Sequence, residues 1–256
     1  MKWKILFPLL ILIIVSSACG AFPGSTDDSG EAVMPTSEIS GVGQGPTAEP
    51  TEAPKRKVMD EFLDEFTTMD LDWSEPFAVT TKALSGKGLS KVSIKDGWLS
   101  FDILDEETYM YQLYQNPVEA DVVLETKYQP GGNHTVNGIA LVCRATEDFS
   151  KWYEFRVSSS NRYSIFLYDK SRKEKDDLNP YVELAGGVSG AISPAKENVF
   201  RAMCNGTTLV LEVNGEQVAS VQDGELQEEG LVGVGAMSSN LTPTFVKFDY
   251  LGVSKP

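Results

Sequence analysis

The sequence predicts an all-β chain folded as a two-sheet antiparallel β-sandwich. Residues 199–221 hold three apolar runs joined by Asn205-Gly206 and Asn214-Gly215. Because Asn-Gly accepts the positive φ angles of a type I′ turn, whose twist matches paired strands, this stretch predicts a three-stranded meander. From residue 57 onward, short alternating runs recur between turn residues about every 8–12 residues, and helical periodicity is scarce. This pattern indicates two packed sheets.

The other elements follow from the same pattern. Residues 58–66 fit a short helix as well as a first strand, and Trp73 after them is expected to anchor the core. Loops are expected at the Gly-rich stretch 129–135, the charged stretch 170–177 and the Gly- and Ser-rich stretch 186–194. The remaining expected strands are 77–81, the hairpin 91–104 with its turn at Asp96-Gly97, 108–114 ending at Asn116-Pro117, 120–128, 136–144, 152–158, 163–168, 231–236 and 244–253.

Residues 1–19 predict a lipoprotein signal peptide. Lys2 and Lys4 precede an apolar run over 5–15, which is too short to span about 30 Å of hydrocarbon. The order of charge, apolar run and small residues is typical of a secretory signal. Cys19 resembles the cysteine of a bacterial lipobox, although Ser16 stands where lipoboxes usually carry Leu. We expect lipidation of Cys19 to anchor the exported chain to a membrane; an ordinary signal peptide, with Cys19 incidental, is the alternative.

Composition separates a linker from a domain. Residues 20–56 are rich in Pro, Gly, Ser, Thr and Glu without apolar periodicity, which predicts a disordered linker. The β-sandwich domain is therefore expected to cover 57–256, a length that suffices for one hydrophobic core. The formal net charge of −15 disfavours nucleic acid and anionic lipid surfaces as partners.

Two cysteines remain once Cys19 is set aside, Cys143 and Cys204. An even pair in an exported domain suggests a disulfide between them. Both lie in expected strands, so they come within bonding reach if those strands are neighbours; two buried thiols are the alternative.

The order of the strand segments resembles a known fold family. GIALVCR (138–144) and KWYEFRVSSSNRYSIFLY (151–168) are followed by FRAMCNGTTLVLEVNGEQVASVQD (200–223), GLVGVGA (230–236) and FDYLGV (248–253). This order resembles the concanavalin A-like lectin and glucanase jelly rolls, and more closely a bacterial, often lipoprotein-borne branch described as LamG-like or 3-keto-disaccharide-hydrolase-like. The resemblance implies two curved sheets with ligands on the concave one. It leaves activity open, because this fold hosts lectins, glycosidases, adhesion modules and structural domains.

No catalytic residue is predicted. The single histidine, His134, lies in a Gly-rich loop where we expect it to be solvated, and no HExxH, CxxC or P-loop motif occurs. The glucanases that the chain resembles place paired carboxylates in a Glu-x-Asp-x-x-Glu pattern on one strand, which this sequence lacks. The acidic cluster over 102–107 runs off a strand end into a loop and is expected to be solvated.

A carbohydrate-binding surface is the main candidate site. Sugars are bound by aromatic faces with a few fixed polar groups in a concave site. Trp152, Glu154 and Arg156 alternate onto the more polar face of one expected strand, and Arg144 and Arg201 lie on strands expected to be its neighbours. These five side chains form either a sugar site or the ordinary outer face of a sandwich.

The resemblance also implies a structural Ca²⁺ where the chain ends meet, with Asp64, Glu65 and Asp249 as candidate ligands; ordinary surface acids are the alternative. No other cofactor is predicted. The sequence favours a non-catalytic carbohydrate-binding or cell-surface interaction module, which binds a polysaccharide or cell-surface glycan on the extracytoplasmic side of a membrane. A structural lipoprotein without a small ligand and a glycoside-processing enzyme with an unrecognised site are the alternatives.

Overall fold

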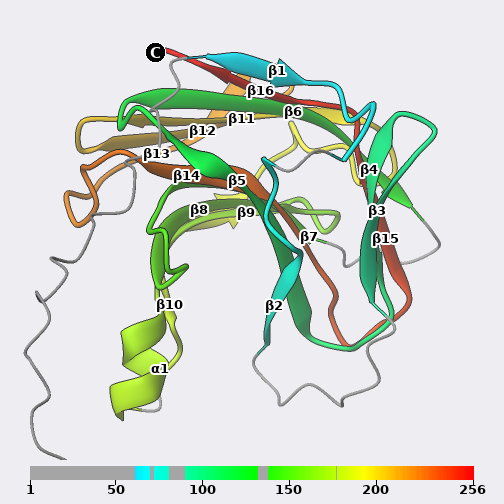
Figure 1. Cartoon of the computed structure of the whole chain (residues 1–256), viewed down its shortest axis with the longest axis horizontal. Helices are drawn as coiled ribbons and strands as arrows, with labels where there is room; N and C mark the ends of the chain where they lie inside the picture. Colours follow the sequence, from blue (N-terminus) through cyan, green and yellow to red (C-terminus); the bar gives the residue numbers. More distant parts are fainter. Residues whose placement is uncertain (1–60, 70–71, 81–89, 132–137, 177) are drawn as a thin grey trace, which may run out of the picture. The chain divides into compact units, whose positions relative to one another are not determined.

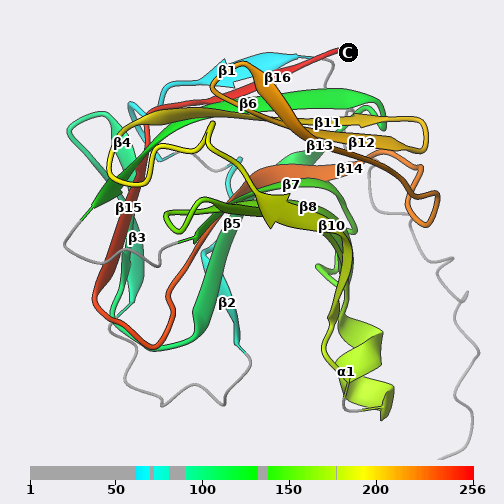
Figure 2. The same ribbon diagram turned by 180° about the vertical axis from the view of Figure 1, so that it is seen from behind.

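The computed structural model describes residues 61–69, 72–80, 90–131, 138–176 and 178–256, which belong to the compact unit Ala53–Pro256. These residues form sixteen strands and one short helix, arranged as two antiparallel sheets that pack face to face (Figure 1, Figure 2). The predicted fold class, an all-β two-sheet sandwich, is confirmed. Within these ranges, no helix has the length and apolar character needed to cross a membrane. Cys19, the predicted linker and His134 lie outside the described residues.

The first sheet has nine strands among the described residues. Its order is β13-β12-β11-β6-β15-β4-β3, and β6 also pairs with β16, which in turn pairs with β1. The predicted meander is formed by β11, β12 and β13, and Asn214 and Gly215 adopt φ angles of 52° and 81° as a type I′ turn requires. The strands are β1 (Phe62–Asp64), β3 (Lys91–Lys95), β4 (Trp98–Ile103), β6 (Val122–Gly131), β11 (Asn198–Asn205), β12 (Thr208–Val213), β13 (Glu216–Gln222), β15 (Thr244–Phe248) and β16 (Leu251–Ser254).

The second sheet has seven strands in the described part of the chain, in the order β10-β9-β8-β7-β14-β5-β2. Its two edges, β10 and β2, both turn to the side opposite β11 and β12, and β3, β4 and β15 of the first sheet curve the same way, so the outer face of the second sheet is concave (Figure 1, Figure 2). The strands are β2 (Phe77–Thr80), β5 (Thr108–Val118), β7 (Gly138–Ala145), β8 (Lys151–Ser158), β9 (Arg162–Asp169), β10 (Tyr181–Val188) and β14 (Gly230–Met237).

The main hydrophobic core lies between the two sheets. Phe101, Phe200 and Phe248 of the nine-stranded sheet and Phe155 of the seven-stranded sheet are fully buried in one cluster. Alternation along β8 explains which side chains point inward, because every second residue of a strand faces the same way. Residues of β8 that do not face this core therefore lie on the concave outer face.

A disulfide between Cys143 on β7 and Cys204 on β11 joins the two sheets, with the Cα atoms 7.0 Å apart. The predicted pairing is confirmed. The two strands are not neighbours within one sheet; they face each other across the core, so the bridge is an inter-sheet link.

Two expectations about loops are wrong. Residues 170–176 form α1 (Lys170–Asp176), because the Asp169 carboxylate accepts the Ser171 N–H at 2.9 Å and caps the first turn. Strand β10 occupies part of the stretch expected to be irregular, and its glycines follow from packing: a Cβ on Gly187 would lie 2.7 Å from the Tyr163 hydroxyl oxygen. Glycine here lets β10 pair closely with β9.

Strand ends also differ from expectation. Of the 58–66 segment, the described residues 61–66 contribute a strand, Phe62–Asp64, and no helix. Strand β5 continues through Pro117 to Val118. Proline has no backbone N–H to donate to a neighbouring strand, but the pairing with β14 shifts register at this point, so no such hydrogen bond is required there. The last expected strand is interrupted at Asp249-Tyr250, which gives β15 and β16 as two separate partners of β6.

Candidate functional site

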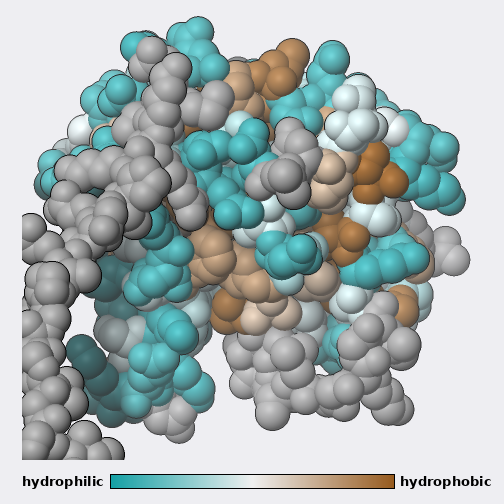
Figure 3. All heavy atoms as spheres, viewed as in Figure 1, coloured by the Kyte–Doolittle hydropathy of each residue, from teal (hydrophilic) through white to brown (hydrophobic). Residues whose placement is uncertain are grey.

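The concave face of the seven-stranded sheet carries a second cluster of aromatic side chains, here called the aromatic cluster. Tyr111, Trp152, Tyr168 and Tyr181 form its centre and are each at most 9% exposed. Trp152 stacks on Tyr168 with ring centroids 3.7 Å apart. Figure 3 shows hydrophobic residues gathered in the middle of the view, next to the hydrophilic lobe that carries α1. Phe77, Tyr109, Phe149 and Phe166 pack around this centre.

Small residues in the middle of the sheet make room for these rings. A Cβ on Gly235 of β14 would lie 2.5 Å from Cδ1 of Tyr111, so the Tyr111 ring rests directly on the glycine backbone. Ala140 is the Cα partner of Gly235 on β7 and is equally small. Tyr111 can therefore extend across β14 and β7 to Glu154 on β8, whose Oε2 accepts its hydroxyl proton at 2.8 Å.

Glu154 is completely buried and fully hydrogen-bonded. Its Oε2 also accepts the Trp152 Nε1–H at 3.2 Å, and its Oε1 accepts the Nε–H of Arg156 at 2.8 Å and an Nη2–H at 2.5 Å. Burial and the Glu154 charge raise the pKa of Tyr111, and the same two causes raise that of Tyr181. Both hydroxyls therefore keep their protons at neutral pH, and the carboxylate has no lone pair directed at solvent.

Arg156 connects this buried network to a pocket. Its guanidinium carbon lies 4.9, 4.4 and 4.9 Å from the ring centroids of Tyr109, Phe166 and Tyr181. Burial alone would lower the pKa of Arg156, but the charges of Glu154 and of the tyrosines outweigh it and raise the pKa, so the guanidinium stays charged. The Arg156 side chain is 17% exposed.

The pocket that Arg156 reaches has a volume of about 370 Å³ and is here called the end pocket. Its walls offer one aromatic face, one guanidinium, one carboxylate, several hydroxyls and one amide. A concave site with a few converging polar groups is the usual form of a small-molecule site. Its lining residues are Glu107, Tyr109, Gly138, Arg156, Ser158, Met237, Ser238, Ser239 and Asn240.

The structure brings three of the five predicted binding residues together. Trp152, Glu154 and Arg156 share the concave face as expected, but Trp152 and Glu154 are 1% and 0% exposed and do not lie in an open cleft. Arg201 is on β11 in the other sheet, where it pairs with Glu212 at 2.9 Å. The expectation that Arg201 borders the Trp152 face is therefore wrong.

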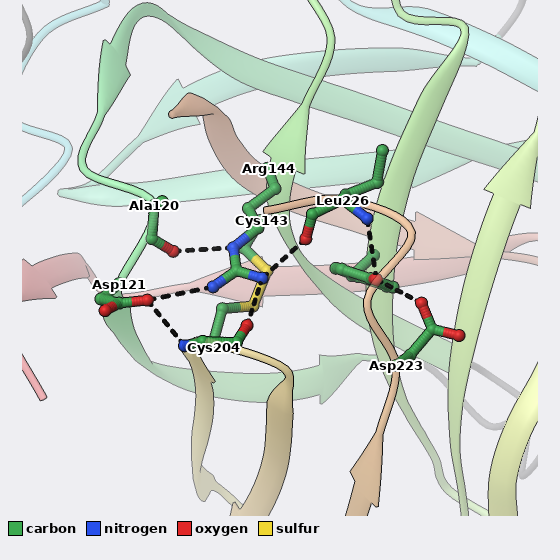
Figure 4. Close-up of a disulfide and its surroundings, with 9 residues drawn as sticks. Ala120, Asp121, Cys143, Arg144, Cys204, Asp223 and Leu226 are labelled. Atoms are coloured by element: carbon green, nitrogen blue, oxygen red, sulfur yellow. Dashed lines mark hydrogen bonds and ion pairs between the residues drawn. A yellow bond between two sulfur atoms is a disulfide. The ribbon is translucent and has the colours of Figure 1, made fainter. Parts of the chain in front are cut away.

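Arg144 also lies apart from this face. With φ at 50°, it turns its buried side chain toward loop carbonyls next to the disulfide (Figure 4). Its guanidinium donates to the carbonyls of Ala120, Gly206 and Leu226 at 2.7–2.8 Å and pairs with Asp121 at 3.2 Å. Burial lowers the pKa of Arg144, and the Asp121 charge opposes this effect. Arg144 therefore fixes loops and offers nothing to a ligand.

Sequence reasoning missed Tyr109, Tyr111 and Tyr181. Alternation in the segment TYMYQLY places Tyr109 and Tyr111 on the same face of β5, so this signal was present. Tyr181 was missed because β10 was not expected. Glu107 belongs to the acidic cluster over 102–107 that was expected to be solvated, and it lines the end pocket instead. The 238–240 loop shows no pattern that would mark it.

The calcium candidates are partly engaged in other contacts. Asp64 accepts the Phe66 N–H and the Trp73 Nε1–H, both at 2.7 Å, and Asp249 pairs with Lys127. Glu65 and Asp249 line one hollow on the nine-stranded sheet. Over the ranges that the structure describes, no group of three or more His, Cys, Asp or Glu side chains is arranged to hold a metal. Calcium binding stays a prediction.

Comparison with known proteins identifies the fold. No protein-family model and no curated protein sequence matches this chain. Among solved structures, it is similar to the carbohydrate-binding module CBM66 from Bacillus subtilis (TM-score 0.50, 13% identity, covering 67% of this chain and 91% of that one).

The chain is also similar to a Bacillus licheniformis β-glucanase (TM-score 0.54, 11% identity, covering 78% of this chain and 100% of that one). A third similar structure is a Bacillus subtilis protein of unknown function with a galectin-like fold (TM-score 0.51, 12% identity, covering 78% and 98%). These likenesses show the fold alone, a jelly-roll β-sandwich of the concanavalin A-like kind, as the resemblance implied.

Proposed function

We propose that the protein is a non-catalytic carbohydrate-binding module that takes the end, or a short piece, of a glycan in the end pocket. The observation that carries the proposal is the placement of Arg156, whose guanidinium lies against three aromatic rings and whose partly exposed side chain lines this pocket. A sugar ring stacked on Tyr109 would find donors and acceptors on the surrounding polar side chains. The likeness to a carbohydrate-binding module is consistent with this role.

The state of Glu154 supports binding without catalysis. A glycosidase needs two carboxyl groups that contact the sugar from opposite sides, about 5–5.5 Å apart in retaining enzymes. Glu154 has no exposed surface and accepts four hydrogen bonds, so it cannot transfer a proton to a ligand or attack one. Its role in the proposal is to orient Arg156.

The filled concave face supports recognition of a short piece of glycan. The aromatic cluster occupies the centre of this face with its own side chains. A long chain would have to displace buried rings to lie across the sheet, whereas one or two sugar units fit the end pocket.

The proposal also places the module outside the cell, held to the membrane through lipid on Cys19 with residues 20–56 as a spacer. The support is the order of charged, apolar and small residues before Cys19. Mass spectrometry of the N-terminal peptide from native membranes should find Cys19 diacylated, and Cys19→Ala should release the protein from the membrane fraction. An unmodified N-terminus at another residue would contradict this part.

Glycan-array binding by the full-length protein tests the end pocket. Ser158→Trp should fill the pocket, because Ser158 lines it and is outside the Glu154 hydrogen bonds. We expect at least a tenfold loss of affinity, while Ser160→Ala, beside it but absent from the pocket lining, should bind like the wild type. Circular dichroism checks that both variants fold. No binding to any glycan by the wild type, or equal binding by Ser158→Trp, would contradict the proposal.

A further inference from the structure

The outer face of the nine-stranded sheet has a hollow of about 510 Å³ that the end pocket does not involve. A straight row of Cα partners crosses five strands there: Leu63, Gly252, Glu125, Arg201 and Glu212. Residues directly opposite each other on paired strands point to the same face. The row therefore presents four side chains outward, and the hollow opens where Gly252 contributes none.

A second hollow of about 430 Å³ continues the first. It shares Leu63, Glu125 and Tyr250 with the first hollow and adds Glu65 and Asp249. The Tyr250 hydroxyl donates to Glu125 Oε1 at 2.8 Å, which fixes both side chains between the two hollows. We call the two hollows together the outer groove.

The two cations along the outer groove are each paired with a carboxylate of the protein. Arg201 pairs with Glu212 at 2.9 Å on one side, and Lys127 pairs with Asp249 on the other. An anionic ligand would therefore meet a carboxylate beside each cation, and Glu65 and Glu125 add further negative charge to the lining. A neutral ligand with many hydroxyls can instead donate to the carboxylates and accept from Arg201.

Apolar surface and spacing favour the same class of ligand. Leu63 is 62% exposed and, together with the Tyr250 ring, offers a surface on which the apolar faces of sugar rings can pack. Neighbouring strands lie about 4.8 Å apart, so the polar groups of the row recur at about the length of one pyranose unit. We propose that the outer groove is a second glycan site, which binds the interior of an extended neutral polysaccharide laid across the strands.

Gly252 allows the groove to be filled without disturbing the sheet. A Cβ there would meet the Glu125 carbonyl oxygen at 3.7 Å, Leu63 Cδ1 at 3.8 Å and Tyr250 Cε2 at 4.0 Å, which are ordinary contacts. Its φ is not in the left-handed region, so a side chain there adds no backbone strain. Gly252→Phe should therefore fold and block the groove, and Gly252→Ala is its matched control.

Affinity electrophoresis of the full-length protein tests the proposal, with lichenan, laminarin, xylan, glucomannan and levan as neutral probes and polygalacturonate as the anionic one. At least one neutral polysaccharide should retard the wild type, and Gly252→Phe should weaken this binding at least tenfold. Gly252→Ala and the end-pocket variant Ser158→Trp should keep it.

Three results would overturn the proposal that the outer groove binds a neutral polysaccharide. These are no retardation of the wild type by any neutral probe, stronger retardation by polygalacturonate than by every neutral probe, or equal retardation of Gly252→Phe and the wild type. Polysaccharide binding that Ser158→Trp abolishes and Gly252→Phe spares would also overturn it, while leaving the end pocket supported. The two sites are thus tested separately.

Discussion

Replacing Glu154 by Gln tests the buried network at its centre. The substitution keeps the shape of the side chain but removes the charge that faces Arg156. It also turns one of two acceptor oxygens into an NH₂ group, which then faces either the Arg156 donors or those of Tyr111 and Trp152. At least one buried donor is then left without an acceptor, since the Tyr111 hydroxyl can turn to donate to Tyr181 but the Trp152 Nε1–H cannot find another partner.

The expected loss of stability follows from these contacts. Removing one partner of a buried ion pair costs about 3–5 kcal/mol of stability. This figure already includes the cost of about 1–3 kcal/mol for each buried donor that is left without an acceptor, so the two costs are not added. Arg156 is 17% exposed and can recover some solvation through the end pocket, which favours the lower bound. We expect Glu154→Gln to lower the free energy of unfolding by about 3 kcal/mol.

Urea unfolding followed by tryptophan fluorescence measures this loss. With a slope of about 2–3 kcal/mol per molar urea, the midpoint should fall by about 1–1.5 M. The matched control is Arg201→Gln, which breaks a pair whose side chains are 41% and 29% exposed and should cost less than about 1 kcal/mol. A loss below 1 kcal/mol for Glu154→Gln would refute the reasoning, since it would mean that no buried charge depends on this carboxylate.

Three further predictions concern stability. Removing the disulfide with Cys143→Ala and Cys204→Ala opens a loop with a sequence separation of 61 and should cost about 4 kcal/mol in denaturant unfolding; a loss under 1 kcal/mol would contradict it. Burial, followed by the charges of Glu174 and Glu154, raises the pKa of Tyr168 to about 12. The folded state therefore holds this proton more tightly than the unfolded state, whose tyrosine pKa is about 10. The free energy of unfolding should then be unaffected below pH 10 and fall as pH rises from 10 to 12, by up to about 1.4 kcal/mol per pH unit. Urea unfolding between pH 8 and 12 should show this fall, and Tyr168→Phe should make it less steep; identical slopes would argue against it. Gly233→Ala should lower the free energy of unfolding by at least about 2 kcal/mol, because the new Cβ would lie 2.3 Å from the Gln112 carbonyl oxygen. The thermal midpoint should fall with it, and an unchanged midpoint would count against so close a contact.

Local sequence patterns predicted the strands well, because the alternation of residue types along a strand follows which of its two faces is buried. Along β8, alternation separates Phe155, which faces the core, from Glu154 and Arg156, which do not. The Asn214-Gly215 turn was likewise predictable, since the required φ angles restrict the residue types. Both signals are local, so one sequence is enough to detect them.

Pairing between strands could not be predicted in the same way. Arg201 was assigned to the Trp152 face because its strand was expected to be a neighbour of the Trp152 strand, whereas β11 belongs to the other sheet. A local pattern shows that a segment is a strand but does not show which sheet it joins. The Gly186-Gly187 pair was taken as a sign of a loop, whereas both glycines lie in a strand, where Gly187 accommodates the Tyr163 ring and Gly186 the Glu183 and Ser164 side chains. The site was only partly predictable because its pocket forms from loops and strands that meet through the topology.

The buried network and the two proposed sites are linked by geometry. On the concave face, Tyr111 and Trp152 use their polar groups on Glu154, so these two rings offer no polar group to a ligand, whereas the end pocket does. On the nine-stranded sheet, Gly252 leaves the outer groove open. Since the hydrophobic core lies between the sheets, the two sites face away from each other, and one short glycan cannot fill both. A polymer or layered glycan network can engage both, and binding at one site then raises the effective concentration at the other, so the module is suited to holding polymeric rather than soluble sugars.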